Sequence, residues 1–190
     1  MMHSTVRVIT DSIVGSGMIY EIEDENVLIV TAGHVTENTC KCRISFYDDT
    51  QCEGTVIKSD SSPDIALIEV ASSALSKETS DGLAKTKSYG KAASNDAGKI
   101  PKDFWCVVPE GMKSGQTLIK GTVESKEEYF YELDATLMMG YMEAYEGYSG
   151  SPMFDEYGTI IGIITAGSQE GIVAGVGMDE IRNWCSKVCK

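Results

Sequence analysis

Hydrophobic runs separated by Gly, Asp and Ser recur along the first part of the chain, between residues 6 and 70. Short apolar runs with turn-forming residues between them are typical of β-strands joined by tight turns. The pattern predicts six strands in this part of the chain, over residues 6–9, 13–22, 27–31, 43–47, 55–58 and 65–70.

A polar stretch rich in Ser, Lys and Asp follows the sixth predicted strand and extends to residue 103. This composition, between two patterned regions, indicates a connecting segment. The strand pattern then resumes over residues 104–108, 117–124, 129–138, 159–165 and 171–176. Only the end of the chain has helical spacing, in a segment that begins with acidic residues. One face of this segment is apolar and consists of Ile181, Trp184, Cys185 and Val188.

We therefore expect an all-β protein with a C-terminal α-helix, built as a sandwich or a barrel. The chain has 190 residues, which suits one globular domain with a sizeable core. Its expected parts are an N-terminal half, a connection, a C-terminal half and the helix, at about residues 1–75, 76–103, 104–176 and 177–190.

Charge and hydrophobicity exclude two classes of partner. The net charge is -13 and the Lys and Arg residues are scattered, so no face could neutralise a nucleic-acid backbone. The longest apolar stretches, residues 27–32 and 160–166, are much shorter than the ~20 residues of a membrane-spanning helix. Residues 1–20 contain no apolar run of the kind that a signal peptide requires.

Six cysteines leave two states open, disulfides or free thiols. A bridge between Cys185 and Cys189 would strain the predicted helix, because residues four apart point the same way. Three cysteines, Cys40, Cys42 and Cys52, lie close in the sequence but have no neighbouring His and no C-x-x-C spacing. We therefore expect no metal site, and no phosphate-binding loop or other motif implies a cofactor.

Ser149 has the setting of a nucleophile, because it stands in the string Gly-Tyr-Ser-Gly-Ser-Pro at residues 147–152. The flanking glycines allow backbone N–H groups to turn toward an oxyanion. His34, directly after the apolar run at residues 27–31, could serve as a rigidly held general base. Asp64, at the start of the run at residues 65–70, could orient the imidazole. Taken singly, each of these residues could equally be an ordinary turn or surface residue.

Together the three strings resemble those of the trypsin-like, chymotrypsin-fold serine peptidases, especially the short bacterial glutamyl-endopeptidase and HtrA types. The order His34, Asp64, Ser149 also matches, whereas the α/β-hydrolase order would require a histidine after Ser149, and none follows. The resemblance implies two six-stranded antiparallel β-barrels with the triad at their junction. It also implies an oxyanion hole from the N–H groups of Gly147 and Ser149, and a peptide or protein substrate.

Substrate-binding residues follow from the same resemblance. The strand lining the cleft would carry Thr165, Ala166 and Gly167, with Thr165 beside Asp64 and able to hydrogen-bond it. Glu143 and Ala144 would line the primary pocket, and an acidic Glu143 would favour Arg or Lys before the scissile bond. Glu143 could equally be a solvated loop residue.

Two further expectations concern activation and class. Tyr148 stands where trypsin-type enzymes have the Asp that pairs with a new N-terminus, so activation by that route is not expected. The alternative function is a non-catalytic module that binds a peptide in the same cleft. The usual location of the bacterial peptidases that the chain resembles, together with the even cysteine count, favours an extracellular or cell-envelope location.

Overall fold

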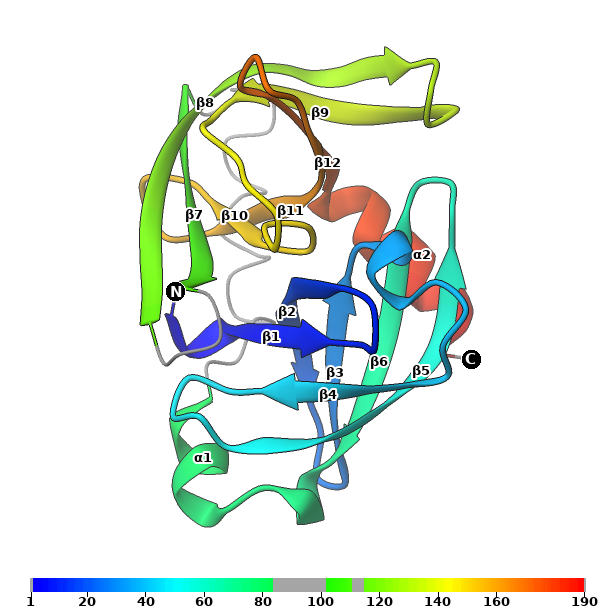
Figure 1. Cartoon of the computed structure of the whole chain (residues 1–190), viewed down its shortest axis with the longest axis vertical. Helices are drawn as coiled ribbons and strands as arrows, with labels where there is room; N and C mark the ends of the chain where they lie inside the picture. Colours follow the sequence, from blue (N-terminus) through cyan, green and yellow to red (C-terminus); the bar gives the residue numbers. More distant parts are fainter. Residues whose placement is uncertain (1, 84–101, 111–114, 190) are drawn as a thin grey trace.

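The first half of the chain forms a closed six-stranded antiparallel barrel, seen in the lower part of Figure 1. The computed structural model describes residues 2–83, 102–110 and 115–189. Around the first barrel the strand order is β1-β2-β3-β6-β5-β4. Its elements are η1 (Met2–Ser4), β1 (Thr5–Ile9), β2 (Val14–Ile22), β3 (Asn26–Thr31), η2 (Gly33–Thr36), β4 (Lys41–Ser45), β5 (Gln51–Asp60), β6 (Ile65–Ala71), η3 (Ser72–Ala74) and α1 (Lys77–Gly82).

A second closed barrel of six antiparallel strands stacks above the first one (Figure 1), in the order β10-β11-β12-β9-β8-β7. The C-terminal helix α2 follows it and crosses back behind the first barrel. The elements of this half are β7 (Asp103–Glu110), β8 (Gly115–Phe130), β9 (Ala135–Tyr141), β10 (Pro152–Phe154), β11 (Ile160–Gly167), β12 (Ile172–Gly177) and α2 (Met178–Val188). The two barrels and the terminal helix agree with the fold that the sequence predicts.

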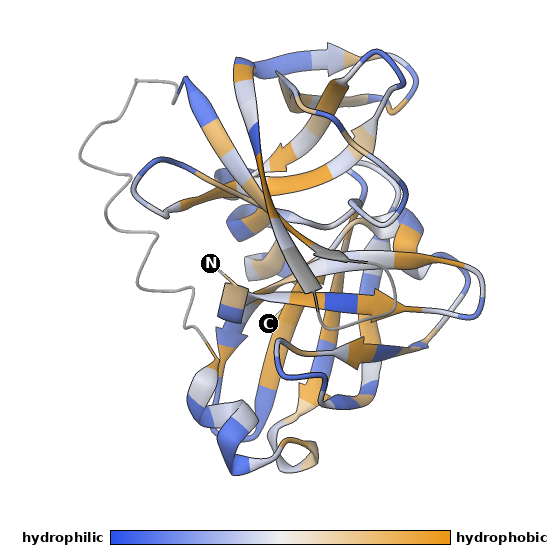
Figure 2. Ribbon diagram, turned by 60° about the vertical axis from the view of Figure 1, so that its left-hand side comes forward, coloured by the Kyte–Doolittle hydropathy of each residue, from blue (hydrophilic) through white to orange (hydrophobic). Residues whose placement is uncertain are grey.

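Apolar side chains from alternate strand positions fill each barrel. The strands in Figure 2 accordingly carry hydrophobic (orange) segments next to hydrophilic (blue) or intermediate (white) ones. One core fills the first barrel, and a second lies inside the other barrel around Phe104, which is fully buried. A third core joins the barrels to the helix, because Trp184 and Ile181 of α2 belong to the same cluster as Ile65 and Leu67 of β6. The helix therefore fastens the second half of the chain to the first.

One predicted strand is wrong in its bounds. The sequence predicts a single strand over residues 129–138, but β8 continues to Phe130 and β9 begins only at Ala135. Residues 131–134 form the turn between them, where the amide of Leu133 donates to the carbonyl of Phe130 and Asp134 has a φ of 45°. The apolar residues on both sides of this turn hide it in the hydrophobic pattern, and the β8–β9 ribbon extends at the top of Figure 1.

The predicted connection at residues 76–103 lies largely outside the described residues. Of the part that is described, residues 77–82 form α1, which begins at Ser76 with a side-chain cap on the amide of Thr79. All six cysteines are free thiols, so the structure contains none of the disulfides that the even count allowed. No helix in the described part of the chain has the length and hydrophobicity that a membrane crossing requires.

Candidate active site

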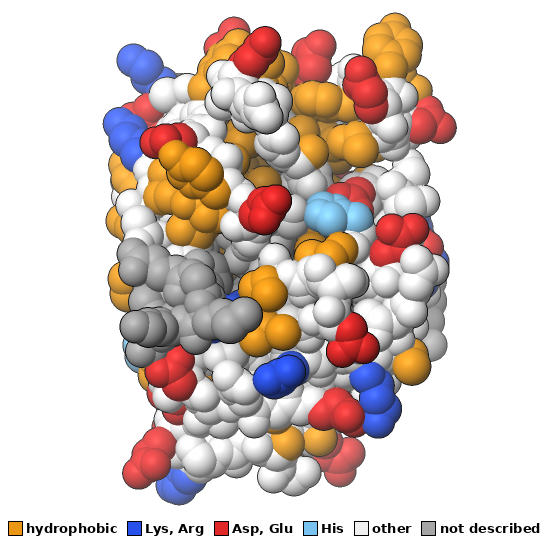
Figure 3. All heavy atoms as spheres, in the orientation of Figure 1, with side chains coloured by type: hydrophobic (Ala, Val, Ile, Leu, Met, Phe, Trp, Pro, Cys, Tyr) orange, Lys and Arg blue, Asp and Glu red, His pale blue; other side chains and the backbone are white. Residues whose placement is uncertain are grey.

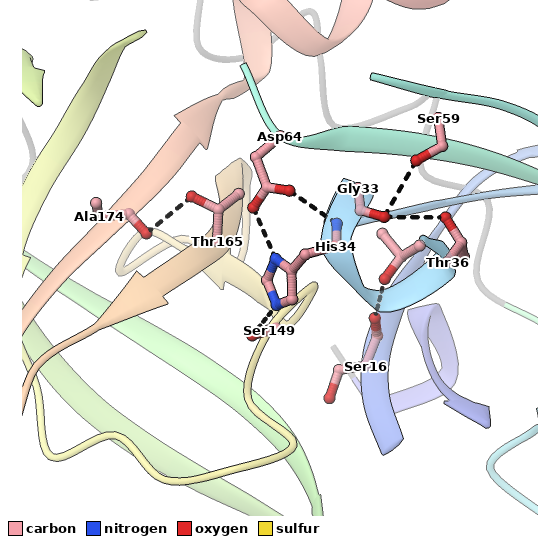
Figure 4. Close-up of polar contacts among 10 residues, drawn as sticks. Ser16, Gly33, His34, Thr36, Ser59, Asp64, Ser149, Thr165 and Ala174 are labelled. Atoms are coloured by element: carbon pink, nitrogen blue, oxygen red, sulfur yellow. Dashed lines mark hydrogen bonds and ion pairs between the residues drawn. The ribbon is translucent and has the colours of Figure 1, made fainter. Parts of the chain in front are cut away.

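The three residues that the sequence singles out meet at the junction of the barrels (Figure 4). The Nδ1 atom of His34 lies 2.8 Å from Oδ2 of Asp64, and its Nε2 atom lies 2.9 Å from Oγ of Ser149. His34 and Asp64 belong to the first barrel and Ser149 to the second. Packing of one barrel against the other thus assembles a hydrogen-bonded chain from residues 115 positions apart.

Asp64 holds His34 at two points. Its Oδ1 accepts the backbone N–H of His34 at 2.8 Å, while Oδ2 faces the ring. Asp64 is 6% exposed and lies in the turn between β5 and β6 with a φ of 64°, a left-handed conformation that Asp tolerates better than most residues. Because an ionised carboxylate only accepts, Nδ1 carries the ring proton in this arrangement. Nε2 is then the acceptor that faces the hydroxyl of Ser149.

The electrostatics of His34 follow from the same pair. The hydrogen bond to Asp64 raises the pKa of His34, and burial, which favours the neutral imidazole, only partly opposes this effect. The charges of Asp64 and Glu37 add to the increase. His34 therefore becomes protonated, and loses its acceptor at Nε2, at a higher pH than an isolated histidine would.

Two successive β-turns shape the backbone around Ser149. The amide of Tyr148 donates to the carbonyl of Tyr145 at 3.2 Å, and Gly147, the third residue of that turn, has a φ of 93°. The amide of Ser151 donates to the carbonyl of Tyr148 at 2.9 Å, and Gly150 is again the third residue, with a φ of 87°. A hydrogen-bonded turn whose third residue alone has positive φ is type II, which explains both glycines.

In the type II conformation, the N–H of Gly147 takes no part in the hydrogen bond that closes the turn of residues 145–148. A type I turn would rotate the preceding peptide group by about half a turn and direct this N–H elsewhere. The structure gives no hydrogen bond for the N–H groups of Gly147 and Ser149 within the described residues. Both N–H groups are therefore available as hydrogen-bond donors.

Ser16 of β2 ties this loop to the first barrel, and sequence reasoning missed it. Its amide donates to the carbonyl of Ser149 at 2.7 Å and its Oγ to the carbonyl of Gly147 at 2.8 Å. Thr31 in turn donates to the carbonyl of Ser16 at 2.6 Å. A signal was present, since glycines 15 and 17 flank Ser16 within a strand, and such glycines mark places where another backbone approaches closely. A Cβ on Gly15 would lie 3.1 Å from the carbonyl oxygen of Ser149.

Thr165, Ala166 and Gly167 lie together on one strand, but the expected hydrogen bond from Thr165 to Asp64 is not formed. Residues 165–167 form the end of β11, yet the hydroxyl of Thr165 donates to the carbonyl of Ala174 at 3.5 Å, a long bond, rather than to Asp64. The reason is that Ala174 lies on the neighbouring strand β12, whose register places it opposite Ala166. Ala166 is half-buried and Gly167 is exposed.

Glu143 does not lie in a buried pocket. Its carboxylate is exposed and accepts a hydrogen bond from the hydroxyl of Tyr145. Ala144 is half-buried and packs on the apolar core beneath the loop, which includes Met142 and Val173. A Cβ on Gly167 would lie 3.1 Å from the Cβ of Ala144, so the backbone at Gly167 approaches the side chain of Ala144 closely.

A cavity and an acidic surface lie near the site. A cavity of about 690 Å³ lies beside His34, between η2 and β5, with Thr36, Ile57 and Lys58 among its lining residues. The face drawn in Figure 3 carries many more acidic than basic side chains. Within the described residues, no group of three or more His, Cys, Asp or Glu is placed to hold a metal ion.

Comparison with known proteins yields a family model and several relatives. Residues 15–163 match the trypsin-like peptidase domain. The chain is 27% identical, over 171 residues, to the serine protease Do-like HtrA of Bacillus subtilis, covering 88% of this chain and 36% of that protein. It is 26% identical over 190 residues to a probable periplasmic serine endoprotease, DegP-like, of Buchnera aphidicola, covering 93% and 35%. The chain thus spans about a third of the length of these two relatives.

Solved structures give the same fold. The serine endoprotease from Yersinia pestis matches with a TM-score of 0.74 at 18% identity, over 98% of this chain and 63% of that one. At this identity the match supports the double-barrel fold alone.

Proposed function

Because the chain belongs to the trypsin-like peptidase domain family, we propose that it is a serine endopeptidase with Ser149, His34 and Asp64 as its catalytic residues. The observation that carries the proposal is the continuous hydrogen-bonded chain from Asp64 through the His34 ring to the Ser149 hydroxyl. This arrangement can make a serine hydroxyl nucleophilic at neutral pH. The chemistry requires no cofactor.

The proposed reaction has two halves. Oγ of Ser149 attacks the scissile carbonyl carbon while Nε2 of His34 takes the hydroxyl proton, and the N–H groups of Gly147 and Ser149 stabilise the oxyanion. His34 then returns the proton to the leaving amine as the peptide C–N bond breaks, leaving an acyl-enzyme. Water, deprotonated by His34, attacks the acyl carbon, and His34 then gives this proton to Oγ of Ser149 as the ester bond breaks, which releases the carboxylic acid and restores the serine hydroxyl. Asp64 stays ionised and stabilises the imidazolium in both halves.

We propose that Ala144 and Gly167 line a primary pocket that accepts a small side chain before the scissile bond. The close approach of Ala144 and Gly167 narrows the space between the two walls, and the core beneath Ala144 is apolar. Glu143 would favour Arg or Lys only weakly from its exposed position, because solvent and salt screen an exposed charge. Peptide substrates with Ala, Val, Arg or Lys at this position distinguish the two. If Arg and Lys lead, and Glu143→Gln removes their lead, the acidic-pocket prediction holds instead.

Substrates are proposed to be peptides or proteins, and the location to be the cell envelope or outside the cell. The location is supported by the Buchnera relative, which is described as a probable periplasmic serine endoprotease. An alternative is a peptide-binding module of the same fold that does not cleave. The complete hydrogen-bonded chain disfavours it, because pure binding would not require an imidazole aligned on a serine hydroxyl.

A fluorophosphonate probe tests the proposal directly. We expect the wild-type protein to be labelled, Ser149→Ala and His34→Ala to lose labelling, and Ser186→Ala, an exposed serine of α2, to be labelled like the wild type. Peptide cleavage should follow the same order. A folded wild-type protein that is not labelled would refute the peptidase proposal and favour the binding module.

A further inference from the structure

Trp184 of the C-terminal helix reaches across to the first barrel and hydrogen-bonds one carboxylate there. Its indole N–H donates to Oδ2 of Asp60 at 2.7 Å, joining residues 124 positions apart. Trp184 is 6% exposed. The ammonium group of Lys58 lies 2.9 Å from the same oxygen and 5.7 Å from the centre of the indole ring. The contact is therefore a charge-assisted hydrogen bond from a buried donor.

Asp60 occupies a special place, because it is the last residue of β5. It pairs with Ile65, the first residue of β6, so the turn that carries Asp64 begins directly after it. Its side chain thus connects the base of this turn to α2. Burial would raise the pKa of the Asp60 carboxyl, but the hydrogen bonds from Lys58 and Trp184 lower it by more, so the group is ionised at neutral pH.

The backbone of the same segment supports the residue before His34. The carbonyl oxygen of Asp60 lies 2.5 Å from the position that a Cβ on Gly33 would take, so only glycine fits there. The hydroxyl of Ser59 donates to the carbonyl of Gly33 at 3.1 Å (Figure 4). A shift of residues 59–60 would therefore move Gly33, and with it the amide and ring of His34.

We propose that Trp184 and Asp60 are positioning residues, which hold the end of β5 so that the His34 ring stays aligned between Asp64 and Ser149. Neither side chain touches the reacting atoms, and both act through Gly33 and the turn of Asp64. This inference rests on the proposed function. It differs from a general stabilising role because it ties the α2 contact to the protonation equilibrium and alignment of one imidazole.

The test compares four variants of the full chain. Asp60→Ala removes the acceptor, Asp60→Asn keeps a side-chain oxygen for the indole, and Trp184→Phe removes the donor but keeps an aromatic ring. Ile181→Val is the control, because Ile181 is fully buried in the same cluster as Trp184 but its aliphatic side chain cannot hydrogen-bond Asp60. Thermal unfolding, peptide kinetics and the pKa of His34 from NMR titration are measured for each. His3→Gln identifies the signals of the only other histidine.

We expect Asp60→Ala and Trp184→Phe to lower the pKa of His34 and to reduce kcat about tenfold with KM little changed, since small misplacements of catalytic groups are costly. Asp60→Asn should stay within about twofold of the wild type, because it still accepts the indole hydrogen bond. Ile181→Val should lower the melting temperature without moving the pKa.

The proposal is overturned if Asp60→Ala and Trp184→Phe lower only the melting temperature, as the control does, and leave the pKa of His34 and kcat in place. Trp184→Phe could fail to fold, and Asp60→Ala, at a partly exposed side chain, then decides alone. Failure of the proposed function is distinguishable. A wild-type protein that neither cleaves peptides nor reacts with the fluorophosphonate probe would refute the peptidase proposal. The NMR pKa of His34 would still report whether the contact between Trp184 and Asp60 positions His34.

Discussion

Gly147 and Gly150 are each the third residue of a type II turn, but replacement by Ala should affect activity at Gly147 and stability at Gly150. Both have positive φ, 93° and 87°, where a Cβ costs about 1–2 kcal/mol. Around Gly147 the space is open, since a Cβ would lie 3.7 Å from its nearest neighbour, the carbonyl oxygen of Val14. At Gly150 the Cβ would lie 1.9 Å from the carbonyl oxygen of Ser16 and 2.5 Å from Oγ1 of Thr31. Only the second replacement would overlap with neighbouring backbone atoms.

We expect Gly147→Ala to fold and lose activity. The variant can avoid the strain by adopting a type I turn, which moves the N–H of residue 147 out of the proposed oxyanion hole. If catalysis requires a return to type II, a cost of about 1–2 kcal/mol lowers kcat about 5- to 30-fold. Complete loss of one donor sets the upper limit, about 100- to 1,000-fold. KM should change little, because the donor acts mainly in the transition state.

Gly150→Ala should instead destabilise the fold. The Cβ must push Ser16 away, and that breaks the hydrogen bond from the Ser16 amide to the Ser149 carbonyl. Steady-state kinetics and thermal unfolding of both variants check the contrast. Full activity of Gly147→Ala would refute its N–H as an oxyanion donor, and a large drop in its melting temperature would refute the open space around it.

Three further predictions concern the rest of the site. Asp64→Asn should reduce kcat about 10,000-fold, because the ring loses its fixed tautomer. Since Asp64 raises the pKa of His34, and activity is lost as pH falls through that pKa, the acid limb of the Asp64→Asn profile should move to lower pH, as a pH–rate titration would show. Ser16→Ala removes the hydrogen bond to the Gly147 carbonyl and should cost about 1 kcal/mol, measured by urea unfolding, with slower probe labelling. In the native protein a thiol reagent should modify the exposed Cys40 and Cys189 quickly and the fully buried Cys106 only after unfolding; equal rates would contradict the burial.

The two β-rich halves could be predicted from the sequence because most strands are separated by polar turns and the periodicity survives within each run, whereas their closure into two barrels was implied by the family resemblance. The exception is the range 129–138, where the hydrophobic pattern does not reveal the turn between β8 and β9. The turn of residues 131–134 contains Tyr131 and Leu133 and no glycine, so hydrophobicity continues across it. Its reversal is visible only in the backbone, where Asp134 takes a positive φ.

The meeting of His34, Asp64 and Ser149 could be expected from the sequence, because each one stands in a string with a local physical reason and the three occur in the order of a known family. The contacts of Ser16 and Trp184 could not be predicted because their partners, Gly147 and Asp60, lie more than a hundred residues away in the chain. Such contacts depend on how the barrels and the helix pack, which periodicity does not encode. Glu143 was assigned by counting along a loop, and a count does not determine whether a side chain is buried.

Tyr148 shows how this loop is held without an acidic residue beside the serine. The residue is half-buried, packs on the core of the second barrel, and its ring lies edge-on to that of Tyr145 with centroids 5.9 Å apart. Three hydrogen bonds fix the backbone around it, two from Ser16 and one from the Gly150 amide to the carbonyl of Ile164. These bonds come from strands of both barrels, so the type II turns are set by barrel packing and do not depend on an ion pair at position 148. The proposed oxyanion hole should therefore form together with the fold.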